Sequence, residues 1–524
     1  MDARVPVLIV GGSLVGLSAS VLLGRHNVPH MLVERHSGTA IHPRAASFHQ
    51  RTLEIFRDAG IQRAVEQAAE REFVQNGAII AVDTLGGREL ASFYRSFNEG
   101  VEALSPTRRL FITQIGLEPV LRRRAAELGA DLRYATELAH FSQDDEGVTA
   151  VLRSRDGGAE QTVHARYMIA ADGVHSAVRQ TLGIAMEGRG EFARCATIYF
   201  RADVRALLRG RNLSVVYVNQ PRQRAFFRFS IEGDAGFLAV FATYDEHGQR
   251  DAVLEQALSP ADCAALVRSA LGVSDDFEVG IENVQYWAAT AATAAAFRQG
   301  NIFLAGDSAH VMPPTGGFGG NTGVADAHNL AWKLAMVLRG DADERLLDSY
   351  EAERKPIAQM TVEQAYRRYV ERVDPSLPSH DLAPNLADTA IELGAVYRSS
   401  AVLSEDDNSA VVEVPETPSG QPGTRIPHIW IEEEGGPIST LDLAGTDVVL
   451  VAGPSADRWL ASAEAVGVRT RRLADPIIVS ALGLGSDGAL LLRPDAVIAW
   501  RSNHAASEHP ADVLRDALRA LGVR

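Results

Sequence analysis

Residues 305–323 read AGDSAHVMPPTGGFGGNTG, a loop rich in glycine and proline that directly follows the apolar segment NIFL. A tight turn needs only one or two residues of this kind. Because glycine has no Cβ, the longer run lets the backbone approach a large, flat ligand closely. Asp307, at the start of the loop, can accept hydrogen bonds from a polyol, although capping a helix is the simpler role for an aspartate there.

The segment GGSLVG at 11–16 is a second candidate ligand site. It follows a predicted strand and opens a predicted helix, where the dinucleotide fingerprint G-x-G-x-x-G is found, but Ser13 replaces the second glycine. Gly11 can form the tight turn and Gly16 the close helix–strand contact, and Ser13 is small enough to let a diphosphate reach the helix N-terminus. Glu34, at the end of the next strand, suits the hydroxyls of a ribose. A tight turn without a nucleotide is the alternative.

A third motif, DGVHSAVR at 172–179, follows another apolar strand. Its D-G-x-x-S-x-x-R spacing places Arg179 one helical turn after a serine, whereas a plain Asp-Gly turn at Asp172 is the alternative. We interpret His310 as a packed, hydrogen-bonded residue and not as a catalytic base.

Aromatic residues are concentrated between 187 and 286, in segments such as AFFRFSI. Their β-branched and aromatic composition, with period-two stretches, predicts an antiparallel sheet. Because strand residues alternate between faces, Phe226 must lie opposite to its two neighbours at 227 and 229. The candidates for the wall of a substrate cavity are Phe227, Phe229, Phe237 and Trp287. For each single ring, packing in the protein core is the alternative.

The elements that position these motifs form an α/β pattern. A strand at 5–10, a helix at about 15–23 and a strand at 30–35 make a β-α-β unit, typical of a doubly wound sheet. Apolar spacing near 3.6 residues predicts helices at 50–60 and 116–129. After the glycine loop, we expect the next helix to begin near Val324.

Composition excludes several classes of function. The net charge of −16 argues against a nucleic-acid partner and against a basic membrane-binding face. The two cysteines, Cys195 and Cys263, make neither a disulfide framework nor a metal-binding motif, so we expect no metal. No run is apolar and long enough to suggest a membrane span, and we expect a reducing, cytoplasmic setting.

The combination of motifs resembles the para-hydroxybenzoate hydroxylase class of FAD-dependent aromatic monooxygenases. The motifs that carry this resemblance are GGSLVG with Glu34, DGVHSAVR, the loop GDSAHVMPPTGGFGGNTGVADAHNLAWKLA and the later YEAERKP. The match covers about residues 1–370. The tail, with STLDLAGTDVVLVAG and LLLRPDAVIAWR, resembles the thioredoxin-like domain of phenol hydroxylase and of the aromatic polyketide hydroxylases. It lacks a CxxC motif, so we expect a structural domain that is dispensable for the chemistry.

This resemblance implies a fold class and a division of the chain. The fold is α/β, with a Rossmann-like FAD-binding domain, an inserted antiparallel-sheet substrate domain and a C-terminal thioredoxin-like domain. The expected parts are the first FAD-binding segment at 1–186 with part of the substrate wall near 74–105, the substrate insert at 187–286, the second FAD-binding segment with connecting helices at 287–372, a linker region at 373–425 and the thioredoxin-like domain at 426–524.

The resemblance also implies a cofactor site. Glu34 would hold the adenosine ribose, Arg44 and Gln114 would line the diphosphate and ribityl region, Asp307 would bind a ribityl hydroxyl, and the glycine loop would lie along the isoalloxazine ring. Asp172 and Arg179 are associated in this class with FAD and the reducing nucleotide. The full set implied for the cofactor is Gly11, Ser13, Leu14, Val15, Gly16, Glu34, Arg35, Arg44, Gln114, Asp172, Asp307, Pro314, Gly317, Gly319, Gly320 and Asn321.

The implied reaction uses NAD(P)H and O2 to hydroxylate a polycyclic, polyketide-like phenol through a flavin hydroperoxide. We expect no catalytic triad, because the cofactor carries the chemistry. Baeyer–Villiger insertion or other tailoring on the same fold, and a simpler phenol hydroxylase, are alternatives, as are a nicotinamide-only dehydrogenase and a flavin-binding accessory protein. The sequence leaves open the substrate, the regiochemistry, NADH or NADPH as reductant, and a monomer or homo-oligomer.

Overall fold

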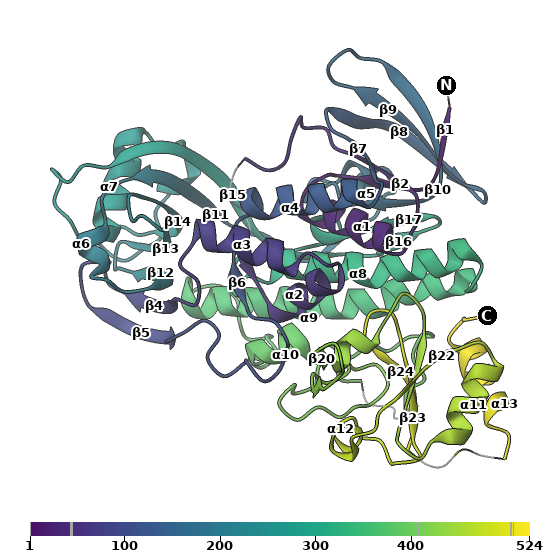
Figure 1. Ribbon diagram of the computed structural model, residues 1–524. Coiled ribbons are helices and arrows are strands. Elements are labelled where there is room, and N and C mark those ends of the chain that lie inside the picture. Colours follow the sequence, from purple (N-terminus) through teal and green to yellow (C-terminus); the bar gives the residue numbers. More distant parts are fainter. Residues whose placement is uncertain (1, 42–45, 406–408, 504–505, 507) are drawn as a thin grey trace.

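The structure is a computed structural model that describes residues 2–41, 46–405, 409–503, 506 and 508–524. Its elements form a first domain with a parallel sheet, an inserted sheet to one side and a C-terminal domain, and two long helices, α8 and α9, run past all three (Figure 1). This is the fold class that the sequence predicts.

The first domain is built on a sheet whose central strands are parallel, in the order β17-β10-β1-β2-β7. The last four residues of β1, with the sequence VLIV, are buried, as expected for a central parallel strand covered on both faces. The strands of this domain are β1 (Ala3–Val10), β2 (His30–Val33), β3 (Ser47–Phe48), β6 (Leu110–Phe111), β7 (Asp131–Arg133), β8 (Thr136–Asp144), β9 (Gly147–Ser154), β10 (Glu160–Ala170), β16 (Arg298–Gln299) and β17 (Ile302–Leu304).

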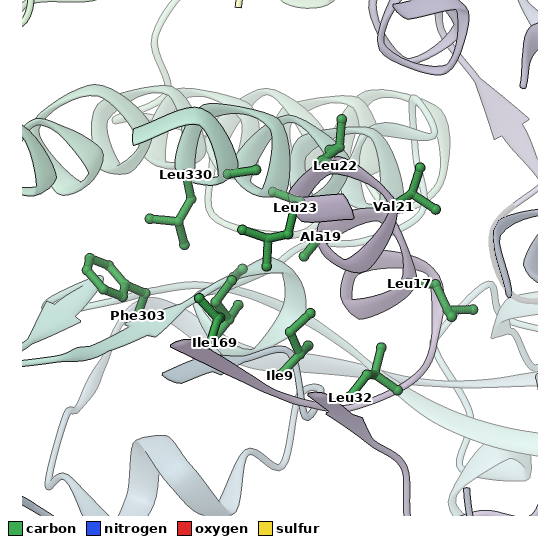
Figure 2. Packing of buried hydrophobic residues seen from close by; sticks show 14 of the residues in the cluster. Ile9, Leu17, Ala19, Val21, Leu22, Leu23, Leu32, Ile169, Phe303 and Leu330 are labelled. Carbon is green, nitrogen blue, oxygen red and sulfur yellow. The ribbon is translucent and has the colours of Figure 1, made fainter. Parts of the chain in front are cut away.

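Helix α1 packs against this sheet and beside α8, and Figure 2 shows apolar side chains of α1 and Leu330 of α8 pointing toward the strands. Leu17 and Leu23 are fully buried, and Leu330 of α8 belongs to the same core. The helices of this domain are α1 (Leu14–Arg25), α2 (Gln50–Asp58), α3 (Gln62–Glu72), α4 (Gln114–Glu127), α5 (Ala177–Thr181), α8 (Phe318–Arg339) and α9 (Asp348–Arg372).

The inserted sheet has the order β18-β15-β11-β14-β13-β12-β4-β5. Its two longest strands, β11 and β15, run from the insert into the first domain, so the expected limits at 187 and 286 fall at or inside strands. The segment near 74–105 contributes β4 and β5 to this sheet. Its elements are β4 (Ala78–Val82), β5 (Glu89–Tyr94), β11 (Met186–Arg201), β12 (Leu213–Asn219), β13 (Gln223–Phe229), β14 (Ala235–Thr243), β15 (Gly280–Ala294), β18 (His310–Val311), α6 (Arg205–Leu208) and α7 (Pro260–Leu271).

The C-terminal domain has a four-stranded sheet in the order β22-β21-β23-β24, with one parallel and two antiparallel pairings. The described parts of the expected linker region, 373–405 and 409–425, form a packed connection, because Asp374, Tyr397, Val402 and Thr424 are buried. The elements from 388 onward are α10 (Asp388–Leu393), β19 (Trp430–Ile431), β20 (Ile438–Ser439), β21 (Val449–Ala452), α11 (Asp457–Ala465), β22 (Arg469–Arg472), α12 (Pro476–Ala481), β23 (Ala489–Leu492), β24 (Ile498–Ser502) and α13 (Pro510–Ala520).

The start of α8 differs from the sequence-based expectation. The helix begins at Phe318, not near Val324, and therefore includes three glycines of the loop. Glycine disfavours a helix by about 1 kcal/mol per residue, but Phe318 is buried and anchors this first turn in the core. Tertiary packing thus overrides local propensity.

Candidate functional site

The turn between β1 and α1 requires glycine at the first and last positions of the fingerprint, Gly11 and Gly16. Gly11 has a φ of +107°, and a Cβ there would lie 2.2 Å from the carbonyl oxygen of Ala171. A Cβ on Gly16 would lie 1.9 Å from the carbonyl oxygen of Gly11. The N-terminus of α1 is therefore pressed against β1 and against the start of the DGVHSAVR motif.

Two carboxylates face this helix N-terminus. Glu34 accepts hydrogen bonds from the backbone N–H of Gly12 at 2.7 Å and of His36 at 2.9 Å. A carboxylate has about four acceptor sites, so Glu34 retains capacity for ribose hydroxyls. Glu118 of α4 accepts from the hydroxyl of Ser13 at 2.5 Å and from the N–H of Leu14 at 3.0 Å.

Sequence reasoning did not identify Glu118, although a signal was present. Glu118 follows Gln114 by four residues, so both side chains lie on one face of α4. The amide nitrogen of Gln114 lies 3.4 Å from the Ser13 hydroxyl, which places the predicted Gln114 beside the fingerprint.

The glycine loop packs closely against the side chain of Val15 in α1. A Cβ on Gly306 or on Gly323 would lie within 2.7 Å of the side chain of Val15. These glycines let the turn that carries Asp307 and the first turns of α8 approach the N-terminus of α1. The side chain of Asp307 is exposed at this junction.

The DGVHSAVR motif and the glycine loop are joined by buried hydrogen bonds. Arg179 is 7% exposed and donates to the carbonyl oxygen of Ser308 at 2.9 Å. The hydroxyl of Ser308 donates to the carbonyl oxygen of Ala170 at 2.6 Å. Asp172 accepts from the N–H of Val178 at 3.1 Å and so caps α5 with one carboxylate oxygen.

A buried cluster around Asp326 fixes the turn at 306–310. Asp326 accepts from Nε2 of His310 at 2.7 Å, from the N–H of Gly306 at 3.0 Å and from Nε of Arg354 at 2.8 Å. His310 is therefore a packed, hydrogen-bonded residue, as the sequence predicts. The neighbouring Arg354 and His310 hold the pKa of Asp326 below its usual range, despite the opposing effect of burial.

The loop residues expected along the flavin ring lie at the start of α8. Gly316 and Gly317 have positive φ values, of 95° and 69°. A Cβ on Gly319 would meet only Met312, at 3.7 Å, so the space beside this first turn is open. The N–H groups of a first helical turn have no partner within the helix and carry a positive dipole end. Pro314 is exposed, and Gly320 follows Gly319 in the same turn.

Asn321 has a structural connection that the sequence did not reveal. Its Oδ1 accepts from the N–H of His49 at 2.9 Å and from the hydroxyl of Thr52 at 2.6 Å. Its Nδ2 donates to the carbonyl oxygens of Ser47 and Gly317. The side chain of Asn321 thus binds α8 to β3 and α2, and its backbone is the part left for a cofactor.

These residues fit FAD. Oε1 of Gln114 and Oδ1 of Asp172 are buried without a hydrogen-bond partner among the described residues, which is costly unless a ligand supplies a donor. The crowded turn at Gly11, the acidic Glu34 at the end of β2 and the open first turn of α8 suit a diphosphate, a ribose and a flat ring in that order. Arg35 is exposed beside Glu34, and Arg44 lies outside the described residues.

The inserted sheet has two different faces. The rear face, which includes Phe200, Phe227 and Phe229, packs against α7. The front face, which includes Phe226, Phe237, Phe241 and Trp287, forms a chain of ring contacts that reaches Tyr369 of α9.

The front face is the one that lies toward the glycine loop. Ala291 of β15 packs with Tyr366 of α9, and Met312 of the loop lies against the same cluster. The expectation that Phe227 and Phe229 line the cavity is therefore corrected: they share a face, as the alternation predicts, but that face is covered by α7. Phe226 lies on the opposite, front face, in contact with Phe237 and Phe241.

Phe237 and Trp287 do lie on the front face. Trp287 donates from Nε1 to the hydroxyl of Thr197 at 3.0 Å. It also lines a groove of about 320 Å³ with Cys195, Leu254 and Tyr286 at the outer edge of the sheet.

Among the described residues, no group of three or more His, Cys, Asp or Glu side chains is arranged to hold a metal ion. In the same part of the chain, no helix is long and apolar enough to cross a membrane.

Comparison with protein families identifies both parts of the chain. Residues 4–365 match the family described as FAD binding domain, and residues 419–522 match the family described as aromatic-ring hydroxylase, C-terminal. The chain is 48% identical, over an alignment of 542 positions, to 4-methyl-5-nitrocatechol 5-monooxygenase from Burkholderia sp, covering 99% of this chain and 98% of that protein. It is 38% identical to tetracenomycin B2 monooxygenase-dioxygenase from Streptomyces olivaceus, with 99% of each chain covered.

A solved structure shows the same fold. The ternary complex of aklavinone-11 hydroxylase with FAD and aklavinone superposes with a TM-score of 0.92 and 36% identity, covering 100% of this chain and 99% of that one. These matches exclude a nicotinamide-only dehydrogenase. The chain belongs to the FAD-dependent aromatic-ring hydroxylases, which are flavoprotein monooxygenases that use a reduced nicotinamide nucleotide.

Proposed function

We propose that this monooxygenase hydroxylates a polycyclic, polyketide-like phenol bound between the front face of the inserted sheet and the loop at 312–321. The observation that carries the proposal is the aromatic front face, where Phe226, Phe237 and Trp287 lie on the side of the sheet that packs toward Met312. Large flat rings can stack on or against such side chains. Relatives that act on tetracenomycin and aklavinone support a polycyclic substrate.

The residues of this chain contribute binding, orientation and exclusion of water. FAD, when bound, supplies the redox chemistry with O2 after reduction by NAD(P)H. The turn at Gly11, the side chains of Glu34 and Asp307, and the first turn of α8 would hold the cofactor. The aromatic front face orients the phenol and keeps water away from it, which strengthens the electrostatic interactions within the site.

A single-ring substrate is the second candidate. It is supported by the 48% identity with 4-methyl-5-nitrocatechol 5-monooxygenase, which extends over 99% of this chain. The front face is also partly filled by its own side chains, because Phe241 contacts Phe226, Trp287 and Tyr369.

We further propose a cytoplasmic location, supported by two buried cysteines that are both free.

One experiment separates these candidates. The purified flavoprotein is mixed with a panel of tetracyclic phenols and of substituted catechols, and NAD(P)H oxidation, O2 uptake and product mass are measured together. A polycyclic product that gains one oxygen supports the first candidate, and coupled turnover with catechols alone supports the second. The position of the inserted oxygen distinguishes hydroxylation from Baeyer–Villiger insertion. Absence of substrate-stimulated NAD(P)H oxidation across the panel would contradict both.

A further inference from the structure

The second carboxylate at the N-terminus of α1 is in an unusual position. Glu118 is 0% exposed. Its Oε1 accepts hydrogen bonds from the N–H of Leu14 and from the hydroxyl of Ser13, and its Oε2 accepts one from the N–H of Ala40 at 2.7 Å. A helix N-terminus favours an anion, and in a dinucleotide fold that anion is the diphosphate. Glu118 therefore holds donors that the diphosphate of FAD also needs.

Among the residues that the structure describes, the charges around Glu118 do not compensate for its negative charge. Glu34, at the end of β2, is a second negative group beside the same turn, and its own partner there is His36. Tyr134 is near both carboxylates, and Arg122 of α4 is stacked on the ring of Tyr134, 4.1 Å from its centroid. Among the described residues, no arginine or lysine forms an ion pair with Glu118. Burial raises the pKa of this carboxyl, and Glu34 acts in the same direction.

We propose that Glu118 takes up one proton from solvent when FAD binds, and that the Ser13–Glu118 pair then presents its donors to the diphosphate. A diphosphate brings negative charge to a site where a buried carboxylate is already poorly solvated, and like charges favour the protonated carboxyl. The inference rests on the cofactor assignment and not on the proposed substrate.

The proton changes the direction of one hydrogen bond. With Glu118 ionised, the hydroxyl of Ser13 donates to Oε1. With a proton on Oε1, the carboxyl donates to the oxygen of Ser13, and the Ser13 hydrogen and the N–H of Leu14 become available to the anion. One proton enters from solvent and none leaves, so the charge of the FAD complex is one unit more positive. This exchange gives a reason for serine at the position where the fingerprint has glycine.

The test measures FAD binding to the apoprotein as a function of pH, by quenching of flavin fluorescence. At pH values above the ordinary glutamate range, the wild-type dissociation constant should increase with pH, with a limiting slope of about tenfold per pH unit for one proton. Calorimetry in two buffers of different ionisation enthalpy should show proton uptake on binding. In Glu118→Gln, the neutral isostere, the slope and the uptake should disappear. Glu127→Gln, an exposed position on the same helix, is the matched control and should behave as wild type.

A second variant keeps the test decisive if Glu118→Gln does not fold. Ser13→Gly removes a donor to the carboxylate, which raises its pKa further, so the pH midpoint of FAD binding should move upward. A midpoint that is unchanged in Ser13→Gly overturns the proposal. So does a wild-type dissociation constant that is independent of pH, or a pH slope that persists in Glu118→Gln.

Discussion

Individual glycines in this site are required for different reasons, and single substitutions can separate them. Gly16 is required by the fold, because a Cβ there would lie 1.9 Å from a backbone oxygen. Gly319 has open space beside it, with Met312 as its nearest neighbour at 3.7 Å. Gly319→Val should therefore leave the thermal unfolding of the apoprotein within about 1 kcal/mol of wild type, yet reduce bound flavin per protein. Gly16→Ala should lower stability with or without FAD. Full flavin content in Gly319→Val would contradict a role for this turn in packing on the ring.

The carboxylate of Asp307 is predicted to contribute to FAD binding through its charge. Its side chain is exposed at the turn held by Asp326, so Asp307→Ala should leave the fold intact. If the carboxylate binds a ribityl hydroxyl, its loss should weaken FAD binding by about 1.5–3 kcal/mol, the range for a hydrogen bond to a charged group. Asp307→Asn, which keeps the shape, should recover part of this loss. Equal flavin affinity in all three proteins would remove Asp307 from the site.

At the scale of elements, the alternation of β13 yields a specificity prediction. Phe226→Leu enlarges the front face and should shift the relative rates of substrate-stimulated NAD(P)H oxidation across a panel of phenols, while FAD affinity is unchanged. Phe227→Leu changes the rear core beside α7 and should lower the free energy of unfolding by about 1 kcal/mol or more without altering that preference. If the two variants gave the same substrate profile, the front face would not be the substrate wall.

The same strand shows how far sequence reasoning reaches. The β1–α1–β2 unit, helices α2 and α4 and the pairing of Phe227 with Phe229 were predictable, because their apolar periodicities are local. Which face of β13 meets the flavin domain was not, since both faces are aromatic and only α7 distinguishes them. The early start of α8 was also unpredictable, because it depends on the burial of Phe318 and the bonds of Asn321 with distant segments.

For the whole molecule, buried histidines predict a loss of stability in acid. Burial lowers the pKa of His26 to about 3 and that of His428 to about 4, and it also lowers the pKa values of His30, His49 and His328. The unfolded chain binds these protons near pH 6.5 and the folded chain does not, so stability is present above that pH and is lost as pH falls. Each histidine contributes at most about 1.4 kcal/mol per pH unit.

Chemical denaturation of the apoprotein at several pH values checks this prediction. The free energy of unfolding should fall steeply below about pH 6.5, and His26→Gln should reduce the slope by one proton. The apoprotein is used because proton uptake at Glu118 would make FAD bind more tightly in acid and so mask part of the loss. A free energy of unfolding that does not change between neutral pH and about pH 5 would contradict the assignment of neutral buried histidines.

The C-terminal domain is joined to the flavin domain through a buried ionic cluster and a shared core. Glu353 of α9 accepts from Arg493 at 2.6 and 2.9 Å and from Lys333 of α8 at 2.8 Å, and all three side chains are at most 2% exposed. Trp332 of α8 lies in the same apolar cluster as Leu491. The helix that presents the glycine loop therefore packs against the tail. We predict that the position of this helix depends on the tail, whereas the sequence alone led us to expect a tail that is dispensable for the chemistry.

Two comparisons test this dependence. Removing one partner of a buried ion pair costs about 3–5 kcal/mol, so Arg493→Ala should lower the free energy of unfolding by that amount. Arg339→Ala breaks an exposed pair with Asp447 between α8 and the same domain, and it should cost less than about 1 kcal/mol. A chain that ends near residue 405 should lose flavin, because it leaves Glu353 without Arg493 and exposes Trp332. If the shortened chain bound FAD as tightly as the full one, the tail would be an appendage and the position of α8 would be set by the first domain alone.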